Sequence, residues 1–330
     1  MDKVARLDIR QRSELFRETA SLMKTTSAIV EKDFWVVWAL DKLFGDSQLR
    51  QVLKFKGGTS LSKAFGLIGR FSEDIDLILD WREVTGEDPY RERSKSQQMK
   101  FNEATNEQAA AYIRETLLPQ VAARVDSLCS CSIDPDNPHS LNIRYPSAFS
   151  DAYLRPEILL EIGPLASWLP SAEFAIGAYA ARHFPGVFER AECFVPTILA
   201  KRTFWEKATI LHQEAHRAED RQMPPRYSRH YYDMARLAQS DVKVEALADV
   251  ALLAEVVAFK QRFYPSAWAN YEMARPGSFR LIAPAYRFDA LRKDYQAMQN
   301  MIFDRHLSFE AIIETLTGLE TEINALGSGI

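Results

Sequence analysis

The stretch KFKGGTSLSKAFGLIGRFSEDIDLIL, residues 54–79, decides how the chain is interpreted. Its pattern predicts a short strand over 52–56, a turn at Gly57 and Gly58, a helix, and a second strand over 75–79. Paired glycines allow a tight turn in which the backbone can approach a ligand closely. The stretch therefore predicts a strand–turn–helix–strand unit with a binding function at the turn.

The turn and the helix after it predict a site for phosphate. Thr59 or Ser60 can cap the helix, and the free N–H groups at a helix start favour a phosphate group. Lys63 lies on the first turns of the same helix and can add a positive charge. Together with Gly57 and Gly58, these residues form the predicted nucleotide-binding turn.

Two aspartates at the start of the second strand predict a site for a divalent metal ion. Asp74 and Asp76 are two residues apart, so on a strand both carboxylates point to the same face. A hard cation relieves their repulsion, and Mg²⁺ favours carboxylate oxygens shared with phosphate oxygens. A phosphate-holding turn beside a metal-holding pair is the layout that nucleotidyl transfer requires. The alternative is a surface turn followed by an edge strand with solvated acids.

The same stretch carries a family resemblance. GGTSLSK followed by RFSEDIDLIL resembles the DNA polymerase β-type nucleotidyltransferase superfamily, and within it the AbiEii/AbiGii toxin family of toxin–antitoxin and phage-defence systems. TFWEK at 203–207 and RHYYD at 229–233 are also similar to segments of that family. The resemblance implies that Lys207 contacts nucleotide phosphate and that Asp233 orients Lys207 or acts as base. From the residues alone, Lys207 and Asp233 could equally form an interhelical ion pair.

Four further positions or segments carry candidate site residues. Glu161 lies within an apolar strand, where burial is costly unless the carboxylate is paired, so it is either a third metal carboxylate or the partner of an arginine. Ser72 precedes the aspartate pair and is expected to bond phosphate or stabilise the loop. Residues 31–33, Glu-Lys-Asp, are expected to be a solvated helix start, with a support role near the site as the alternative. The basic segment 90–100 is expected to be a solvated face, with RNA contact as the alternative.

The predicted fold class is α+β. A nucleotidyltransferase core with a small mixed β-sheet flanked by helices is expected over 1–195, and a helical C-terminal domain that completes the active-site cleft over 196–330. Residues 164–194 are expected to form loops and short elements. A helix is expected from Pro196 onward, with a capping box at Thr203 that restarts it.

Composition indicates a cytoplasmic protein. The net charge of −4 excludes an overall basic coat, so RNA would need local patches. Three cysteines, an odd and sparse set, favour a reducing compartment over a disulfide scaffold. No apolar run reaches the ~20 residues that span a bilayer, and the start lacks a signal core. We therefore expect no membrane partner.

The resemblance also implies the cofactor and the partners. Mg²⁺ is expected at Asp74, Asp76 and Glu161, with Mn²⁺ as the alternative ion, and an NTP is the expected substrate. RNA, with the tRNA 3′ end favoured, is the expected acceptor, and a cognate antitoxin is the expected partner. The rival hypotheses are a nucleotidyltransferase that modifies protein side-chain hydroxyls and a non-catalytic nucleotide-binding module.

Overall fold

The structure, a computed structural model, describes residues 1–151, 154–303 and 306–327. It divides into two compact units. The first comprises Met1–Phe65 and Phe71–Ile198, and the second comprises Gly66–Arg70 and Leu199–Ile330. The short segment Gly66–Arg70 thus belongs to the second unit although the first unit flanks it in the sequence.

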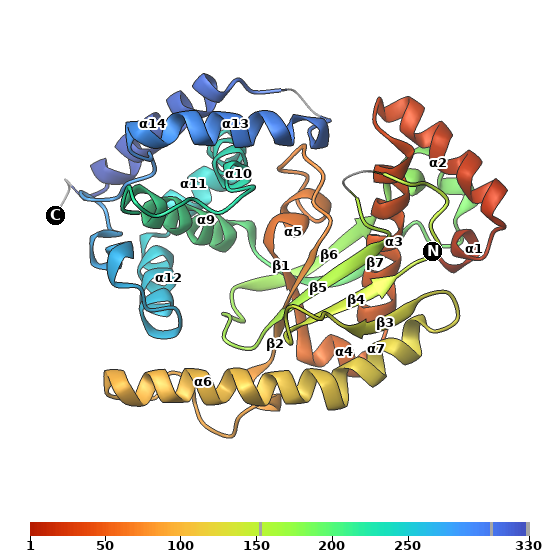
Figure 1. Ribbon diagram of the computed structural model, residues 1–330, viewed down its shortest axis with the longest axis horizontal. Coiled ribbons are helices and arrows are strands. Elements are labelled where there is room, and N and C mark those ends of the chain that lie inside the picture. Colours follow the sequence, from red (N-terminus) through yellow and green to blue (C-terminus); the bar gives the residue numbers. More distant parts are fainter. Residues whose placement is uncertain (152–153, 304–305, 328–330) are drawn as a thin grey trace. The chain divides into compact units, whose positions relative to one another are not determined.

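Within the described residues, the first unit is built on a seven-stranded mixed sheet with the order β3-β4-β5-β2-β1-β7-β6. The pairs β2–β5 and β1–β7 are parallel, and the other neighbours are antiparallel (Figure 1). The strands are β1 (Leu53–Lys56), β2 (Ile75–Leu79), β3 (Ser130–Ile133), β4 (Ser140–Arg144), β5 (Glu157–Gly163), β6 (Ser171–Gly177) and β7 (Glu192–Ile198). The predicted mixed sheet flanked by helices is confirmed.

One face of this sheet forms the core and the other is polar. In β5, Ile158, Leu160 and Ile162 are buried, while Glu161 on the opposite face is exposed. Strand alternation explains this division, because successive side chains point to opposite faces. Helix α3 (Ser27–Phe44) packs against the sheet and is buried along most of its length. The remaining helices are α1 (Asp2–Ala5), α2 (Ile9–Met23), α4 (Ser47–Val52), α5 (Gly57–Lys63), α6 (Lys95–Tyr112), α7 (Leu118–Val125) and α8 (Tyr179–His183).

The strands β6 and β7 correct the prediction of loops and of a helix starting at Pro196. In β7, Cys193 and Val195 are buried, whereas Glu192 and Phe194 are exposed, which is the alternation of a strand. Pro196 argues against a strand in the sequence, since proline lacks the N–H that pairing with a neighbouring strand requires. β7 nevertheless pairs along its whole length with β6, and with β1 only at Thr197.

The second unit is helical. Its helices are α9 (Ala200–Ala215), α10 (Ser228–Ala238), α11 (Asp241–Leu247), α12 (Val250–Phe263), α13 (Phe288–Met298) and α14 (Phe309–Ala325). α10 packs on α9, α13 and α14. The predicted capping box at Thr203 is wrong, because α9 already begins at Ala200 and Glu206 pairs with Arg202. No helix in the described part of the chain is long and apolar enough to cross a membrane.

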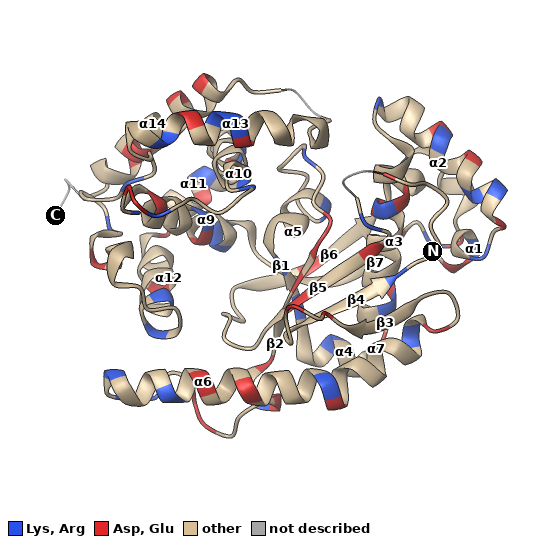
Figure 2. Ribbon diagram, in the orientation of Figure 1, with Lys and Arg blue, Asp and Glu red and all other residues tan. Residues whose placement is uncertain are grey.

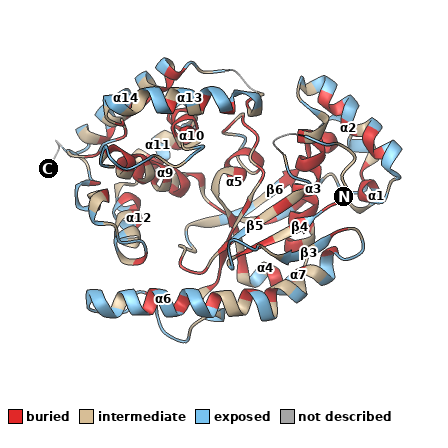
Figure 3. Cartoon of the chain, in the orientation of Figure 1, coloured by how far each residue is buried: buried red, intermediate tan, exposed pale blue. Residues whose placement is uncertain are grey.

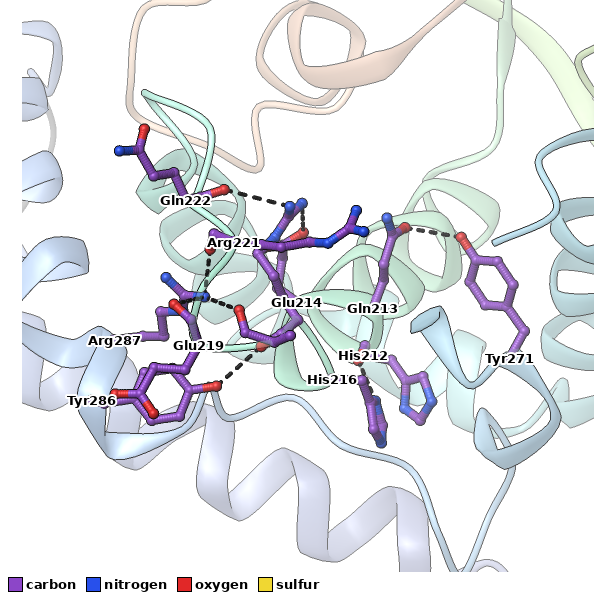
Figure 4. Close-up of polar contacts among 12 residues, drawn as sticks. His212, Gln213, Glu214, His216, Glu219, Arg221, Gln222, Tyr271, Tyr286 and Arg287 are labelled. Carbon is purple, nitrogen blue, oxygen red and sulfur yellow. Dashed lines mark hydrogen bonds and ion pairs between the residues drawn. The ribbon is translucent and has the colours of Figure 1, made fainter. Parts of the chain in front are cut away.

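Polar contacts fasten the loop between α9 and α10 to a distant part of the same unit (Figure 4). The Tyr286 hydroxyl donates to the Arg217 carbonyl at 3.0 Å. The Arg287 guanidinium donates to the carbonyls of Ala218 and Arg221. These bonds satisfy loop carbonyls, and so they hold the loop after α9 against Tyr286 and Arg287.

His212, on α9, is a buried and neutral histidine. Its Nδ1 accepts from the Arg280 backbone N–H at 3.1 Å, and its Nε2 lies 3.0 Å from the Asn270 carbonyl. The ring must therefore carry its proton on Nε2 and none on Nδ1. Burial lowers the pKa of His212 to about 4.

We expect His212 to make the protein sensitive to acid. Because its folded pKa lies below the unfolded value of about 6.5, the unfolded chain takes up the extra proton. The contribution to stability is complete above pH 6.5 and is lost as pH falls toward 4, by up to about 3 kcal/mol. Denaturant unfolding of His212→Gln should show a flatter pH dependence over this window than the wild type. His183→Gln, at an exposed position, is the control, and equal slopes in all three proteins would contradict the assignment.

Candidate active site

The two aspartates share one face of the sheet. Asp76 lies in β2, and Asp74 comes directly before the strand. Along this segment Glu73 and Ile75 are buried, whereas Asp74 and Asp76 are half-buried. The buried positions face the core, so the two carboxylates point to the polar face. Figure 2 shows the acidic segment that leads into β2 in red.

A cross-strand row brings a third carboxylate beside Asp76. Asp76 is in register with Lys56 on β1 and with Glu161 on β5, and Glu161 is in register with Ser140 on β4. Neighbouring strands lie about 4.8 Å apart, and residues in register share a face. Glu161 is exposed, so the expected cost of burying it does not arise. The Ser140 hydroxyl is buried and has no hydrogen-bond partner among the described residues.

Gly57 lies directly against the Asp76 carboxylate. Its φ of +83° is a conformation that side chains rarely adopt, and a Cβ built on it would come 1.9 Å from Asp76 Oδ2. The glycine turn and the Asp76 carboxylate are therefore in contact. Only a residue without a side chain fits between them.

The hydroxyls expected to cap α5 bond elsewhere. Since α5 begins at Gly57, with Gly58 as its second residue, Thr59 and Ser60 lie inside the helix, and the capping prediction is wrong. Thr59 Oγ1 donates to the Asp74 carbonyl and lies 2.9 Å from Ser72 Oγ. Ser60 Oγ donates to the Gly57 carbonyl at 2.8 Å. Thr59 thus ties the helix to the segment that carries the aspartates.

The Lys63 side chain was expected near the turn. In the structure it lies in the interior of the first unit. Its ammonium donates to Asp33 Oδ1 and lies 3.9 Å from the centre of the Tyr179 ring. The side chain is 3% exposed, and burial lowers the pKa of Lys63. The expected role of Lys63 in holding phosphate is not supported, because its buried ammonium is paired with Asp33.

The Glu31-Lys32-Asp33 segment of α3 is not a solvated helix start. The three residues are 1%, 3% and 2% exposed, and Figure 3 shows α3 in the colour of buried residues. Glu31 accepts from Ser147 and from backbone N–H groups of 148–149, and Asp33 accepts from the Tyr179 N–H at 2.7 Å. The expectation of solvation is wrong, since each of the three charges is buried and has a polar partner.

In the second unit, Lys207 and Asp233 form a buried cluster with Arg70. Asp233 is 0% exposed and accepts from Lys207 Nζ at 2.7 Å and from two nitrogens of Arg70 at 2.6 and 2.7 Å. The two cations hold the pKa of the Asp233 carboxyl well below its usual range. Burial lowers the pKa of Lys207, and burial beside the Lys207 cation lowers the pKa of His230. Sequence reasoning missed Arg70, because no spacing links it to a residue 163 positions away.

The residues present fit a divalent ion whose coordination the substrate completes. Among the described residues, no three or more His, Cys, Asp or Glu side chains come together as a ready-made metal cluster. The donors along the Asp74–Asp76 face are nevertheless all oxygens. Mg²⁺ is commonly held by one or two carboxylates plus substrate phosphates, and Asp74 and Asp76 provide such a pair.

A separate pocket of about 420 Å³ opens between the loop after β2 and α6. Arg91, Arg93 and Lys100 line it together with two glutamates. The Arg93 guanidinium lies 3.9 Å from the centre of the Phe101 ring. The segment expected to be a solvated face thus contributes to a concave surface of mixed charge.

Comparison with known proteins places the chain among the nucleotidyltransferases. The family model described as "Nucleotidyl transferase AbiEii toxin, Type IV TA system" matches residues 38–315. The chain therefore belongs to the AbiEii family of nucleotidyltransferase toxins of type IV toxin–antitoxin systems, and the resemblance found in the sequence is confirmed.

Two solved structures are similar to this chain. MenT4, nucleotidyltransferase toxin Rv2826c from Mycobacterium tuberculosis H37Rv, is 16% identical with a TM-score of 0.42, and the match covers 94% of this chain and 98% of that chain. JHP933 from Helicobacter pylori is 15% identical with a TM-score of 0.43, and the match covers 92% and 94%. No curated protein sequence matches the chain.

The contact between Gly57 and Asp76 predicts a specific effect of adding one methyl group. In Gly57→Ala, the strain of a positive φ, about 1–2 kcal/mol, is joined by displacement of the Asp76 carboxylate. We expect loss of most nucleotidyl transfer at a melting temperature only a few degrees below that of the wild type. Gly66→Ala is the matched control, since Gly66 also has a positive φ but a Cβ there meets open space. Equal activity losses in both variants would refute the role of the contact.

The cluster around Asp233 predicts a large loss of stability when its carboxylate is removed. Asp233→Asn removes the buried carboxylate that pairs with both Arg70 and Lys207, which costs about 3–5 kcal/mol. The free energy of unfolding, measured with urea, checks this value. Asp249→Asn breaks a more exposed pair with Lys201 and should cost about 0–1 kcal/mol. A similar loss in both variants would contradict the buried cluster.

Proposed function

We propose that this nucleotidyltransferase toxin transfers a nucleoside monophosphate from an NTP to an acceptor RNA, with the tRNA 3′ end as the favoured acceptor, in a Mg²⁺-dependent reaction. The observation that carries the proposal is the contact of the Asp76 carboxylate with the Gly57 turn. It joins a backbone surface suited to phosphate with a carboxylate pair suited to a divalent ion. Nucleotidyl transfer needs these two functions side by side.

The metal ion would be held by Asp74 and Asp76, with Glu161 as a third carboxylate. Register supports the third position, since Glu161 lies beside Asp76 on the same face of the sheet. When bound, Mg²⁺ or Mn²⁺ neutralises charge on the phosphates and orients the triphosphate. Phosphate oxygens of the substrate would complete the coordination.

The triphosphate would lie along the turn formed by Gly57, Gly58, Thr59 and Ser60. The absence of side chains at the two glycines allows phosphate to approach the backbone. For Ser72, the bond to Thr59 supports the role of stabilising the loop. Lys63 has no part in this proposal, because its ammonium is paired with Asp33.

For Lys207 and Asp233, their buried ion pair supports the roles of cation and orienting group. Lys207 Nζ lies 2.7 Å from Asp233 Oδ2, and Arg70 donates to the same carboxylate. A phosphate group is a counter-ion suited to a buried ammonium, which supports contact between Lys207 and phosphate. Asp233 would orient Lys207 rather than act as base, since a carboxylate with a strongly lowered pKa is a weak proton acceptor.

The reaction itself would be a single displacement at phosphorus. The acceptor hydroxyl oxygen forms a bond to the α-phosphorus, and the bond from that phosphorus to the pyrophosphate oxygen breaks. The proton of the hydroxyl passes to solvent, and pyrophosphate leaves. Fixed cationic groups stabilise the negative charge that is spread over the phosphates in the transition state.

The pocket beside α6 supports an RNA acceptor. Arg91 and Lys100 are exposed and can contact backbone phosphates, whereas Arg93 is 7% exposed and paired with Glu87. Glu87 and Glu92 line the same pocket and reduce its positive charge. A protein hydroxyl therefore stays the second candidate acceptor. A toxin of this family also implies a cognate antitoxin, which would neutralise growth inhibition.

Labelling with each NTP in turn tests the proposal. Purified protein with Mg²⁺ and total tRNA should place label on RNA, and Asp76→Asn, which keeps the shape of the side chain, should reduce the rate at least about 100-fold. Glu157→Gln, on the same face of β5, is the control and should retain activity.

The other outcomes separate the rivals. Label on protein instead of RNA would establish the protein-modifying alternative. Unchanged transfer in Asp76→Asn would refute the metal assignment. Absence of both label and NTP binding would favour the non-catalytic module.

A further inference from the structure

Helix α3 carries a buried ion pair that the reaction described above does not use. Lys32 Nζ donates to Glu73 Oε2, and their side chains are only 4% and 11% exposed. Glu73 stands between Ser72 and Asp74, in the segment that leads into β2. The pair therefore connects the interior of the first unit to the chain that bears the carboxylates.

Exposure alternates along this segment. Ser72, Asp74 and Asp76 are half-buried, whereas Glu73 and Ile75 are buried. With a side-chain period of two, the inward position of Glu73 and the outward position of Asp74 depend on each other. A shift of one residue would turn both aspartates toward the core.

The segment is held from two sides. On the α5 side, Thr59 bonds the Asp74 carbonyl and Ser72 Oγ. On the α3 side, Lys32 bonds the Glu73 carboxylate. Backbone bonds of β2 start only at Ile75, so Lys32 and Thr59 anchor the part of the segment that lies outside the ladder.

Energetics argue that the ion pair does more than stabilise the fold. Two well-packed apolar side chains of similar volume are usually as stabilising as a buried ion pair. An ion pair differs in that it stabilises one register of the segment over the others. In any other register a buried charge would be left unpaired. Of the residues near Lys32 in this segment, Glu73 has the only carboxylate at a buried position among the described residues.

We propose that Lys32 is a positioning residue for the metal-binding carboxylates. By anchoring Glu73 in the interior, Lys32 fixes the register of 72–76 so that Asp74 and Asp76 face the open side of the sheet. This inference rests on the proposed function, in which Asp74 and Asp76 bind the metal ion. It assigns to α3 a part in metal affinity without any contact between α3 and the metal.

The decisive experiment replaces the ion pair with an apolar pair of similar size. Lys32→Met/Glu73→Met should fold with a melting temperature within a few degrees of the wild type and bind Mn²⁺ at least tenfold more weakly. Mn²⁺ alone is titrated, and the bound fraction is read by electron paramagnetic resonance. Lys32→Gln/Glu73→Gln keeps a hydrogen bond between the two side chains and should bind Mn²⁺ within threefold of the wild type. A merely structural role would leave Mn²⁺ affinity unchanged in both.

Controls separate this inference from the proposed function. Lys42→Met/Asp2→Met removes another ion pair, which joins Lys42 of α3 to Asp2 of α1, and should leave Mn²⁺ affinity unchanged. Asp76→Asn should weaken Mn²⁺ binding; if it does not, the metal assignment itself fails. If Asp76→Asn weakens binding and the folded methionine pair does not, only the role of Lys32 is overturned.

A second variant covers the case in which the methionine pair does not fold. Lys32→Met/Glu73→Gln keeps a polar group at position 73 but removes the ammonium that anchors it. A tenfold loss of Mn²⁺ affinity in this folded variant would support the inference. Affinity within threefold of the wild type would overturn it.

Discussion

The cost of burying charge determines how several segments of the first unit are placed around α3. Glu31, Lys32 and Asp33 are consecutive on a helix, so their side chains leave it in three different directions, each into the protein interior. Each must meet a partner, because an isolated charge in the interior is too costly to retain. The partners are loop 147–149, the segment before β2, and α5 with the start of α8. One turn of helix thereby fixes several segments of the first unit, among them the one that leads to Asp74 and Asp76.

The second unit concentrates its buried charge around a single carboxylate. Asp233 accepts from Lys207 and from two nitrogens of Arg70, so it is well satisfied as an acceptor. The same arrangement accounts for the low pKa of Asp233 and for the neutral state of the neighbouring His230.

Sequence reasoning succeeded where the signal is local. The bounds of β2 and the shared face of Asp74 and Asp76 follow from a period of two, and the mixed fold follows from the order of elements. The family could be recognised from motifs within short segments. These features need no knowledge of how distant parts of the chain meet.

Prediction from the sequence failed where the position of a side chain depends on residues far away in the chain. A Glu-Lys-Asp sequence is indistinguishable from a solvated helix start until the residues around it are known, and Lys63 was assigned to phosphate because Asp33 is 30 positions away. Thr59 was expected to cap a helix, but its carbonyl acceptor belongs to a segment 15 positions later. β7 was missed because Pro196 argues against a strand. The alternation of buried and exposed residues over 192–198 becomes clear only when β6 pairs with it.

The division of the chain limits how such a protein can be rearranged in evolution. The segment Gly66–Arg70 belongs to the second unit but is encoded within the first, so the chain passes between the units at three points. A gene fragment that begins at Leu199 would carry Lys207 and Asp233 without Arg70, and the buried carboxylate would lose two of its three donors. The helical half therefore cannot be exchanged as an independent module by recombination at a single site. Both halves must be inherited together.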